Sequence, residues 1–238
     1  MKLIKQIKTA TCMFGDCMDY MKTLPDNYYK IAIVDPEYGI GASKPSIKPN
    51  KCKQKNGSIL DVKTPTYNHK NWDEKPAGSD YFNELIRVSE NQIIFGVNYY
   101  DYKFESKGRL VWDKLNWYSD QMDAELMYNS FNNRVDVVYY MWAGFMQGLV
   151  ASSNPRDALI QQGNKKLNQK RIHPTEKPIK LYEWLHDKFN IEKNRVLDTH
   201  GGSFSHAQAC INMGIDIDII EKDEEYYKLA INRLNETN

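Results

Sequence analysis

A carboxylate, a proline and an aromatic residue follow a short apolar run near the N-terminus. The run Ile31–Val34 leads directly into Asp35, Pro36, Glu37 and Tyr38. An apolar strand that ends in this way places its last residues at the carboxyl edge of a sheet, where α/β proteins bind ligands. There Asp35 and the Pro36 carbonyl can accept hydrogen bonds from an amine, and Tyr38 can stack on a flat ring. An ordinary strand exit with no ligand is the alternative.

A second group of candidate residues surrounds a glycine turn near the C-terminus. It follows the apolar run 195–197 and consists of Asp198, Thr199, His200, Gly201, Gly202 and Ser203. Such a turn lets a small molecule approach the backbone. Glu221 ends the next apolar run, and an acid about 20 residues beyond a glycine turn suits the hydroxyls of a ribose. Because acidic residues follow and the Gly-x-Gly-x-x-Gly spacing is missing, we expect a cofactor with a ribose and net positive charge; a plain βα turn is the alternative.

A third candidate segment lies immediately before the helix that leads to the glycine turn. Residues 171–178 read Arg-Ile-His-Pro-Thr-Glu-Lys-Pro. The two prolines fix the entry of the chain, and Thr175 is a suitable cap for a helix that Lys177 and Pro178 begin. A capped helix without further function is the alternative interpretation.

Length and composition limit the kind of protein that can carry these segments. The 238 residues suffice for one large domain with an insertion, because compact domains commonly have about 100–200 residues. With 41% hydrophobic and 12% aromatic residues the chain can bury a core, which excludes a disordered or collagen-like protein. The 32 Lys and Arg residues balance 31 Asp and Glu residues, so any polyanionic partner must be met by a local patch.

The cysteines predict a reducing compartment. They form no Cys-x-x-Cys pair and are too scattered for a disulfide framework; they are Cys12, Cys17, Cys52 and Cys210. His173 and His200 have no neighbours at metal-ligand spacing, so no metal site is expected. Lysines interrupt the first apolar residues, and no run approaches the roughly 18 apolar residues of a membrane span. We therefore expect a cytoplasmic protein with no membrane contact.

Strand-like and helix-like segments alternate along the chain. Short β-branched or aromatic runs predict strands at 31–34, 92–97, 109–112, 125–128, 135–142, 195–197 and 215–220. Apolar residues at helical spacing predict helices at 81–90, 178–189, 204–213 and 224–234. This alternation indicates an α/β fold built on a mostly parallel sheet.

Two basic segments do not fit the alternation. Residues 39–70 are rich in Lys, Pro, Asn, Ser and Gly, and residues 143–172 have a similar composition. We interpret the first as a mobile basic loop and the second as a small insertion, both suited to phosphate contact. The residues expected to contact nucleic acid are Lys44, Lys48, Lys51, Lys53, Lys165, Lys166, Lys170 and Arg171. A solvated linker is the alternative for each segment.

Together, the three candidate segments resemble motifs of the adenine-N6 and cytosine-N4 DNA methylases. Residues 35–38 resemble their catalytic Asp-Pro-Pro-Tyr, residues 173–178 their His-Pro-Thr-Gln-Lys-Pro, and residues 198–205 their Asp-Pro-Phe-x-Gly-Ser-Gly-Thr. The catalytic motif comes first, which is the order of the permuted β class. The resemblance implies one Rossmann-like class I methyltransferase domain over residues 1–238, with helices on both faces of a twisted sheet. Segments 39–70 and 143–172 are then the candidate target-recognition region.

The resemblance also implies a cofactor, S-adenosylmethionine, and a role for each residue. Glu221 is expected to hold the ribose hydroxyls, and Asp16 and Cys17 to border the adenine ring. The methionine and ribose parts are expected to lie against Thr175, Lys177, Pro178, Asp198, Thr199, His200, Gly201, Gly202 and Ser203. The catalytic segment is Asp35, Pro36, Glu37 and Tyr38, which would hold a base flipped out of DNA for in-line methyl transfer.

Some residues depart from the family pattern and keep other functions open. Glu37 replaces a proline, Thr199 and His200 replace Pro and Phe, and Phe204 replaces a glycine, which is expected to crowd the cofactor turn. An acid at the first catalytic position favours adenine-specific transfer to N6. The alternatives are a cytosine-N4 enzyme, a methyltransferase for RNA or protein glutamine, and a catalytically impaired relic that binds DNA or cofactor. A restriction endonuclease partner, and either a monomer or a homodimer, are compatible with the family.

Overall fold

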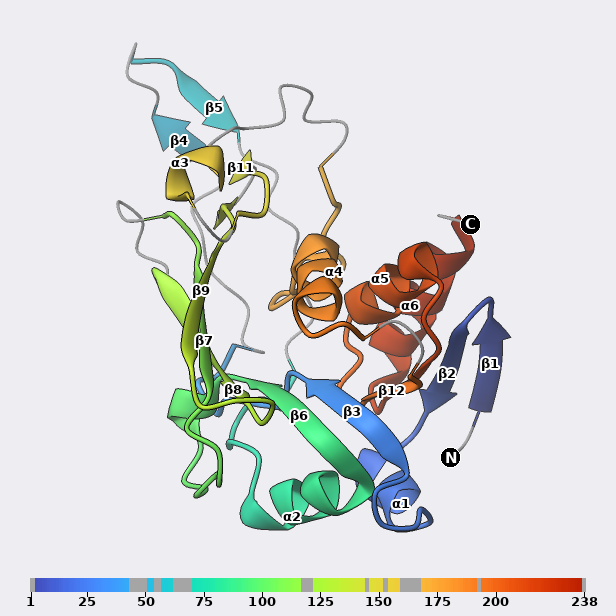
Figure 1. Ribbon diagram of the computed structural model, residues 1–238. Helices are drawn as coiled ribbons and strands as arrows, with labels where there is room; N and C mark the ends of the chain where they lie inside the picture. The colour runs from blue at the N-terminus through green and yellow to red at the C-terminus, as the bar shows by residue number, and fades with distance from the viewer. Residues whose placement is uncertain are drawn as a thin grey trace.

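The computed structural model describes residues 3–42, 51–53, 57–61, 70–116, 122–143, 146–151, 154–158, 168–191 and 194–236. Among these residues, nine strands form one sheet (Figure 1). They are β1 (Leu3–Ile7), β2 (Ala10–Phe14), β3 (Tyr29–Val34), β6 (Ser89–Phe95), β7 (Arg109–Asp113), β8 (Ala124–Asn129), β9 (Val135–Tyr139), β12 (Val196–Asp198) and β13 (Ile217–Glu221). Their order across the sheet is β1-β2-β13-β12-β3-β6-β8-β7-β9.

Helices cover both faces of this sheet. In Figure 1, α1 (Cys17–Met21) and α2 (Ser79–Val88) lie on one face, and α4 (Ile179–Lys188), α5 (Ser205–Met213) and α6 (Glu224–Glu236) on the other. Because successive strand residues point to opposite faces, Ile31 and Ile33 join the core under α4 to α6, whereas Ala32 and Val34 join the core with α2. The apolar run of β3 is thus buried on both sides.

Five neighbouring strands of the sheet, β2, β13, β12, β3 and β6, run parallel. The chain leaves β12 through α5 towards β13, and it leaves β3 through α2 towards β6, in the opposite direction. The order of the strands therefore reverses between β12 and β3. In open α/β sheets, ligands bind at the carboxyl ends of the strands beside such a reversal.

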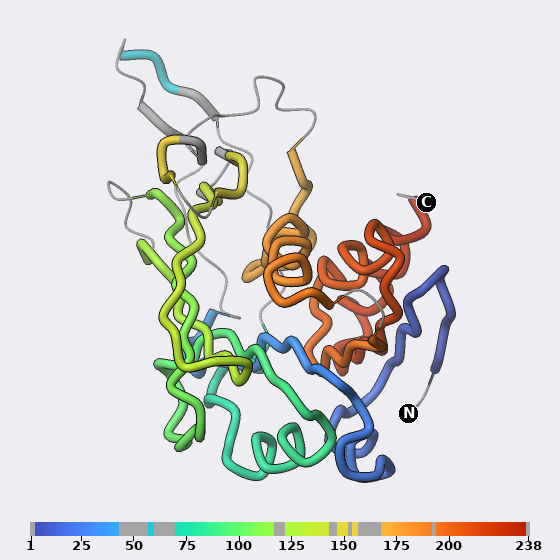
Figure 2. Tube along the Cα trace, viewed as in Figure 1, coloured from blue at the N-terminus to red at the C-terminus, as the bar shows by residue number. Residues whose placement is uncertain are grey.

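The N-terminal strands lie next to the C-terminal elements, as the blue and red segments of Figure 2 show. The cause is the parallel pairing of β2 with β13, whose register sets Phe14 opposite Glu221. The antiparallel β1–β2 pair at this edge was not predicted from the sequence. Four of the five residues of β1 are exposed, so no alternation of apolar and polar residues marks the strand.

Every predicted strand and helix occurs within a few residues of its predicted place. The run 135–142 divides into β9 and a short strand, β10 (Trp142–Ala143), which pairs with β11 (Met146–Gln147). The first basic segment contains the hairpin β4 (Lys51–Lys53) and β5 (Ile59–Asp61), and the second contains α3 (Pro155–Ala158). In the described part of the chain, no helix is long and apolar enough to cross a membrane.

Candidate active site

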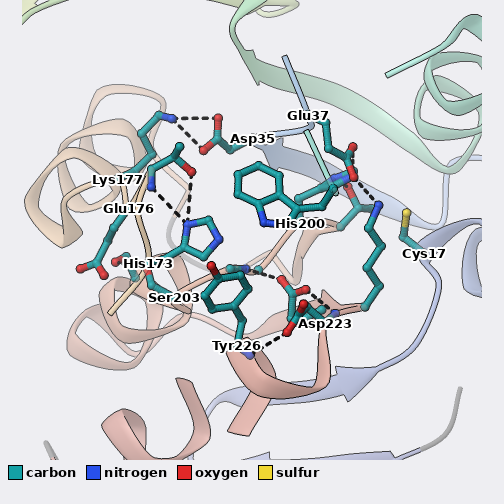
Figure 3. A pocket seen from close by; sticks show the side chains of 18 of the residues that line it. Cys17, Asp35, Glu37, His173, Glu176, Lys177, His200, Ser203, Asp223 and Tyr226 are labelled. Atoms are coloured by element: carbon teal, nitrogen blue, oxygen red, sulfur yellow. Dashed lines mark hydrogen bonds and ion pairs between the residues drawn. The ribbon is translucent and has the colours of Figure 1, made fainter. Parts of the chain in front are cut away.

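The carboxyl ends of β2, β13, β12 and β3 open into a cavity of about 750 Å³, mouth included, which we call the cofactor cavity. Figure 3 shows the side chains that converge on it from these strands and from the segment before α4. Eleven residues named from the sequence line it: Cys17, Asp35, Glu37, Thr175, Lys177, Thr199, His200, Gly201, Gly202, Ser203 and Glu221. Residues more than 180 positions apart in the chain thus share one site.

Three residues that were expected at the cofactor lie outside the lining of this cavity. Asp16 caps α1, where its Oδ1 accepts a hydrogen bond from the Met18 N–H at 2.7 Å. Pro178 is the residue before the first turn of α4. Asp198 is buried beneath the glycine turn and accepts a hydrogen bond from the backbone N–H of His200 at 3.0 Å. Each of them supports an element of the site.

Several lining residues were not assigned to the site from the sequence. They are Gly15, Trp72, His173, Glu176, Tyr182, Ser205, Lys222, Asp223 and Tyr226. Asp223 belongs to the acidic stretch that follows Glu221 and could have been named from it. Trp72 could not, because only the tertiary fold brings residues 70–73 here: the Lys70 ammonium pairs with Asp223 at 2.6 Å, and Asp73 accepts from the backbone N–H of Gly39 at 2.7 Å.

The glycine turn is shaped by two of its own residues and by Phe204. Gly202 has a φ of +51°, and a Cβ on Gly201 would collide with the Phe204 ring. Phe204 itself has a φ of +54°, yet its ring is fully buried against Tyr227 with the centroids 5.9 Å apart. The Phe204 ring therefore lies against the buried side of the turn, at Gly201, and does not line the cofactor cavity. Its ring points into the core, which offsets the unfavourable left-handed backbone.

Glu221 lies at the end of β13 beside the turn. Its Oε2 accepts a hydrogen bond from the Gly202 N–H at 2.7 Å, and its Oε1 accepts one from the Asp223 N–H at 2.6 Å. Burial raises the pKa of this carboxyl, although the two backbone donors favour its ionised form. Each oxygen keeps a further lone pair, so the carboxylate can still accept hydrogen bonds from a ligand.

A buried group of charges, the base-side cluster, lies where β3 ends. It comprises Asp35, Tyr38, Lys114, Glu125 and Lys177. The Lys177 ammonium donates to both Asp35 oxygens, at 3.0 and 2.8 Å, and pairs with Glu125 at 3.2 Å. Tyr38 donates its hydroxyl hydrogen to Asp35 Oδ1 at 2.6 Å, and the Lys114 ammonium lies 2.6 Å from Glu125.

The two carboxylates and two ammonium groups of the base-side cluster balance one another. Burial raises the pKa of Asp35, against the opposing charge of Lys177. Burial alone would raise the pKa of Glu125, but Lys177 and Lys114 lower it. Lys177 keeps a raised pKa despite its burial, because both carboxylates face its ammonium. Burial therefore gives Asp35 a higher proton affinity than an exposed aspartate has, while Lys177 and Tyr38 stabilise its ionised form.

Tyr38 is fixed by its neighbours. Its ring stacks on Tyr99 with the centroids 4.9 Å apart, and a side chain at Gly96, whose φ is +71°, would collide with it. Tyr100 has its hydroxyl 3.1 Å from the Pro36 carbonyl oxygen and 3.0 Å from that of Phe95, and it can donate to one of them at a time. The catalytic segment is thus held in place by the end of β6 and the residues that follow it.

A second ion-paired group, the cofactor-side bridge, joins the catalytic segment to the glycine turn. It comprises Glu37, His200 and Lys222. The His200 Nε2 lies 3.1 Å from Glu37 Oε2, and the Lys222 ammonium pairs with Glu37 Oε1. Burial alone would lower the pKa of His200, but the Glu37 carboxylate raises it. Conversely, burial would raise the pKa of Glu37, and His200 and Lys222 hold it well below its usual range.

The other side of Asp35 faces a second, wider cavity, which we call the base cavity. It has a volume of about 1120 Å³. Its walls carry Pro36, Tyr38, Trp72, Trp112, Met122, Trp142 and Arg171, together with Asp35 and Lys177, which also line the cofactor cavity. Glu37, Trp72, Thr175 and Glu176 line both cavities as well, so the two cavities share the wall that carries the Asp35–Lys177 pair. A cavity walled by flat aromatic side chains suits a planar ligand.

The residues expected to contact nucleic acid are placed unequally. Four of the lysines, Lys44, Lys48, Lys165 and Lys166, lie outside the described residues. Lys51 and Lys53 are the first and last residues of β4. Lys170 is exposed. Arg171 lines the base cavity, with its guanidinium 4.5 Å from the centroid of the Trp142 ring.

Comparison with known proteins defines the family. Residues 53–232 match the family model of the N6/N4 DNA methylases, so the chain belongs to this family. No curated protein matches the chain in sequence. Among solved structures, that of M1.HpyAVI in complex with S-adenosylmethionine is 17% identical, covers 94% of this chain and 99% of its own, and gives a TM-score of 0.50.

The fold is also shared with the cytosine-N4-specific PvuII DNA methyltransferase. That structure is 12% identical, covers 94% of this chain and 86% of its own, and gives a TM-score of 0.52. These comparisons confirm the predicted family and the predicted Rossmann-like methyltransferase fold. The expected cofactor agrees with the S-adenosylmethionine of the M1.HpyAVI complex.

Proposed function

We propose that the chain transfers the methyl group of S-adenosylmethionine to the exocyclic N6 of adenine in DNA. The observation that carries the proposal is the position of Asp35 and Lys177 on the wall shared by the cofactor cavity and the base cavity. Methyl transfer requires donor and acceptor to meet in line at one point, and binding each in its own cavity supplies that geometry.

The cofactor cavity fits the charge of S-adenosylmethionine. Five carboxylates in its lining, Asp35, Glu37, Glu176, Glu221 and Asp223, face two lysines, Lys177 and Lys222. Asp35, Glu37, Glu176 and Asp223 each pair with a basic side chain, whereas Glu221 forms no ion pair among the described residues, so its charge is left to attract a cationic ligand. When bound, S-adenosylmethionine supplies an electrophilic methyl group on its sulfonium.

Within this cavity, we assign Glu221 to the ribose hydroxyls and Cys17 to the border of the adenine ring. The methionine part then lies against Thr175, Ser203 and the glycine turn. Burial raises the pKa of the Cys17 thiol to about 12, so this side chain is neutral and acts by packing. Asp16, Pro178 and Asp198 act indirectly, by holding α1, α4 and the turn.

Asp35 is the group that contacts the acceptor amine. Among the described residues, Tyr38 and Lys177 both bond to its Oδ1, whereas Lys177 alone bonds to Oδ2. A carboxylate oxygen has two lone pairs, so Oδ2 can accept a hydrogen bond from the amine. This bond and one to the Pro36 carbonyl stabilise the positive charge that develops on nitrogen, and the raised pKa of Asp35 favours acceptance of the departing proton. The base reaches this place by leaving the helix stack.

Transfer to N4 of cytosine is the second candidate, and the shared fold of the PvuII enzyme favours it. The same Asp35 and Pro36 acceptors serve either amine, because adenine and cytosine both carry an exocyclic NH₂ on a planar ring. Adenine is preferred because an aspartate, not a serine, occupies the first position of the catalytic segment.

The proposal is tested with labelled S-adenosylmethionine and DNA, followed by digestion and mass spectrometry of the nucleosides. We expect N6-methyladenine, with N4-methylcytosine as the product of the second candidate. Asp35→Ala should lower turnover by about a hundredfold or more while cofactor affinity changes little, because one transition-state hydrogen bond is lost. Asp19→Ala, at an exposed carboxylate on α1, is the matched control and should remain fully active.

The outcomes separate the alternatives. Full activity of Asp35→Ala on DNA would show that the end of β3 is not the catalytic site. Transfer by the wild-type chain to RNA or to protein glutamine alone would replace DNA as the substrate. A folded wild-type chain that binds S-adenosylmethionine but methylates none of these acceptors would be a relic.

A further inference from the structure

A buried cluster of two histidines and a cysteine lies between α4 and α5. His186 comes from α4, and His206 and Cys210 lie one turn apart on α5. The two histidines are 1% exposed and the cysteine is fully buried. As far as the chain is described, these three residues line neither the cofactor cavity nor the base cavity. The proposed methyl transfer therefore does not use them.

Three potential ligand atoms of this cluster converge. His186 Nε2 lies 3.0 Å from His206 Nε2 and 3.4 Å from Cys210 Sγ, and all three atoms lie within 4.8 Å of one another. Tetrahedral zinc with bonds of about 2.1 Å to nitrogen and 2.3 Å to sulfur separates its ligand atoms by roughly 3.3–3.6 Å. Two of the three pairs are already near these separations, and the third, within 4.8 Å, would have to close by up to about 1 Å.

Hydrogen bonding within the cluster leaves one of its three potential ligand atoms unpaired. A ring nitrogen offers either one hydrogen or one lone pair, so His186 Nε2 can serve only one of its two neighbours, the His206 nitrogen or the Cys210 sulfur. The other ring nitrogen of His186, Nδ1, is buried and makes no hydrogen bond to any residue that the structure describes. A cation at the point where the three atoms converge would be bound by all of them at once.

The second nitrogen of His206 is already oriented as in metal sites. His206 Nδ1 lies 3.0 Å from Asp198 Oδ2, and the Tyr182 ring stacks on the imidazole with the centroids 4.4 Å apart. A carboxylate on the far nitrogen of a ligating histidine fixes its tautomer, so that Nε2 presents its lone pair to the metal. Asp198 also holds the backbone of His200 in the glycine turn.

We propose that His186, His206 and Cys210 bind one divalent transition-metal ion, and the donor set of two imidazoles and one thiolate selects zinc. A water molecule is the simplest fourth ligand. Binding releases the thiol proton of Cys210 to solvent, because the thiolate is the ligand. Since the cluster is closed to both cavities, the ion braces α4 against α5 and, through Asp198, stabilises the glycine turn.

The test uses the full chain and does not depend on its methyltransferase activity. Zinc is measured in the purified protein, and the chain is then loaded with Co²⁺ alone in place of zinc. We expect one ion per chain, a thiolate-to-cobalt charge-transfer band, and a lower thermal midpoint after chelation. A folded wild-type chain that takes up neither metal in stoichiometric amount overturns the proposal.

Variants test the ligands. Cys210→Ser should remove the charge-transfer band, and His186→Ala should lower metal affinity at least tenfold. Cys12→Ser, at a buried cysteine of β2 that is not one of the three ligands, is the matched control and should keep both. A charge-transfer band that survives in folded Cys210→Ser would assign the thiolate ligand to another cysteine and overturn the site.

Discussion

The base-side cluster and the cofactor-side bridge lie on either side of the catalytic segment and hold it in different ways. In the base-side cluster, Lys177 and Glu125 have side chains 5% and 8% exposed, and every charge is paired within the interior. In the cofactor-side bridge, the Lys222 side chain is 50% exposed, so its ion pair with Glu37 reaches the solvent. The first arrangement fixes the Asp35 carboxylate in the interior, and the second joins two loops.

The bridge also explains two departures from the family pattern. Glu37 stands where the family has a proline, and His200 stands where it has a phenylalanine. The structure brings these two side chains to 3.1 Å, so the departures form a pair. A proline at position 37 would preset the turn through its fixed φ, whereas this chain holds the turn by an ion pair. We therefore expect Glu37→Pro alone to destabilise the turn, because it removes the ion pair, although the family pattern by itself favours proline there.

The largest effect is expected from breaking the base-side cluster. Lys177→Met leaves Asp35 and Glu125 facing each other without the cation between them. Removing one partner of a buried ion pair typically costs about 3–5 kcal/mol, measured here by urea unfolding at pH 7. The loss should shrink as the pH falls, because protonation of Asp35 removes the repulsion.

The matched control is Lys180→Met on α4. The Lys180 side chain is 62% exposed and pairs with Glu183, so its loss should cost less than about 1 kcal/mol. Equal losses in the two variants would contradict the view that the base-side cluster is a buried, balanced network.

A smaller effect is expected from the cofactor-side bridge. In a double-mutant cycle with Glu37→Gln and His200→Phe, contacting residues of this kind should show a coupling free energy of about 0.5–3 kcal/mol. Unfolding of the two single variants and the double variant measures it. Additive losses would mean that the two departures are independent.

The same pair predicts a pH dependence with a defined sign. Glu37 raises the pKa of His200, so the protonated imidazole stabilises the folded state. This stabilisation is complete below the unfolded pKa of about 6.5 and is lost as the pH rises through the higher folded pKa. His200 in turn lowers the pKa of Glu37, whose contribution is complete above the unfolded pKa of about 4.5 and is lost as the pH falls through the lower folded pKa. Glu37→Gln should remove the fall in stability above neutral pH, whereas Glu74→Gln, at an exposed glutamate, should keep it.

The smallest effect concerns charges outside both groups. Replacing Lys165, Lys166 and Lys170 together by alanine should flatten the plot of log DNA affinity against log salt by up to about 0.9 for each phosphate that these lysines neutralise. Replacing the exposed lysines Lys5, Lys22 and Lys228, which line neither cavity, is the control and should leave the slope unchanged. Equal slopes in both triple variants would show that residues 143–172 are a solvated linker.

The sequence was most informative where local pattern and chemistry coincide. The apolar run before Asp35 and the run before the glycine turn predicted β3 and β12, and the parallel pairing of these strands sets both turns at one edge. Trp72 was missed because its place depends on contacts with residues far away in the chain. The β1–β2 pair was missed because an exposed edge strand carries no apolar alternation.

The sequence by itself determined the family, the alternating elements and most residues of the cofactor cavity, because motif order and periodicity are properties of the chain. Only the tertiary structure decided how those residues act. It placed Asp198 and Asp16 in supporting hydrogen bonds, turned Phe204 into the core, and paired Glu37 with His200. It also brought His186 to His206 and Cys210. The physical reason is that the direction of a side chain and the charge that faces it depend on packing between elements, which local sequence does not encode.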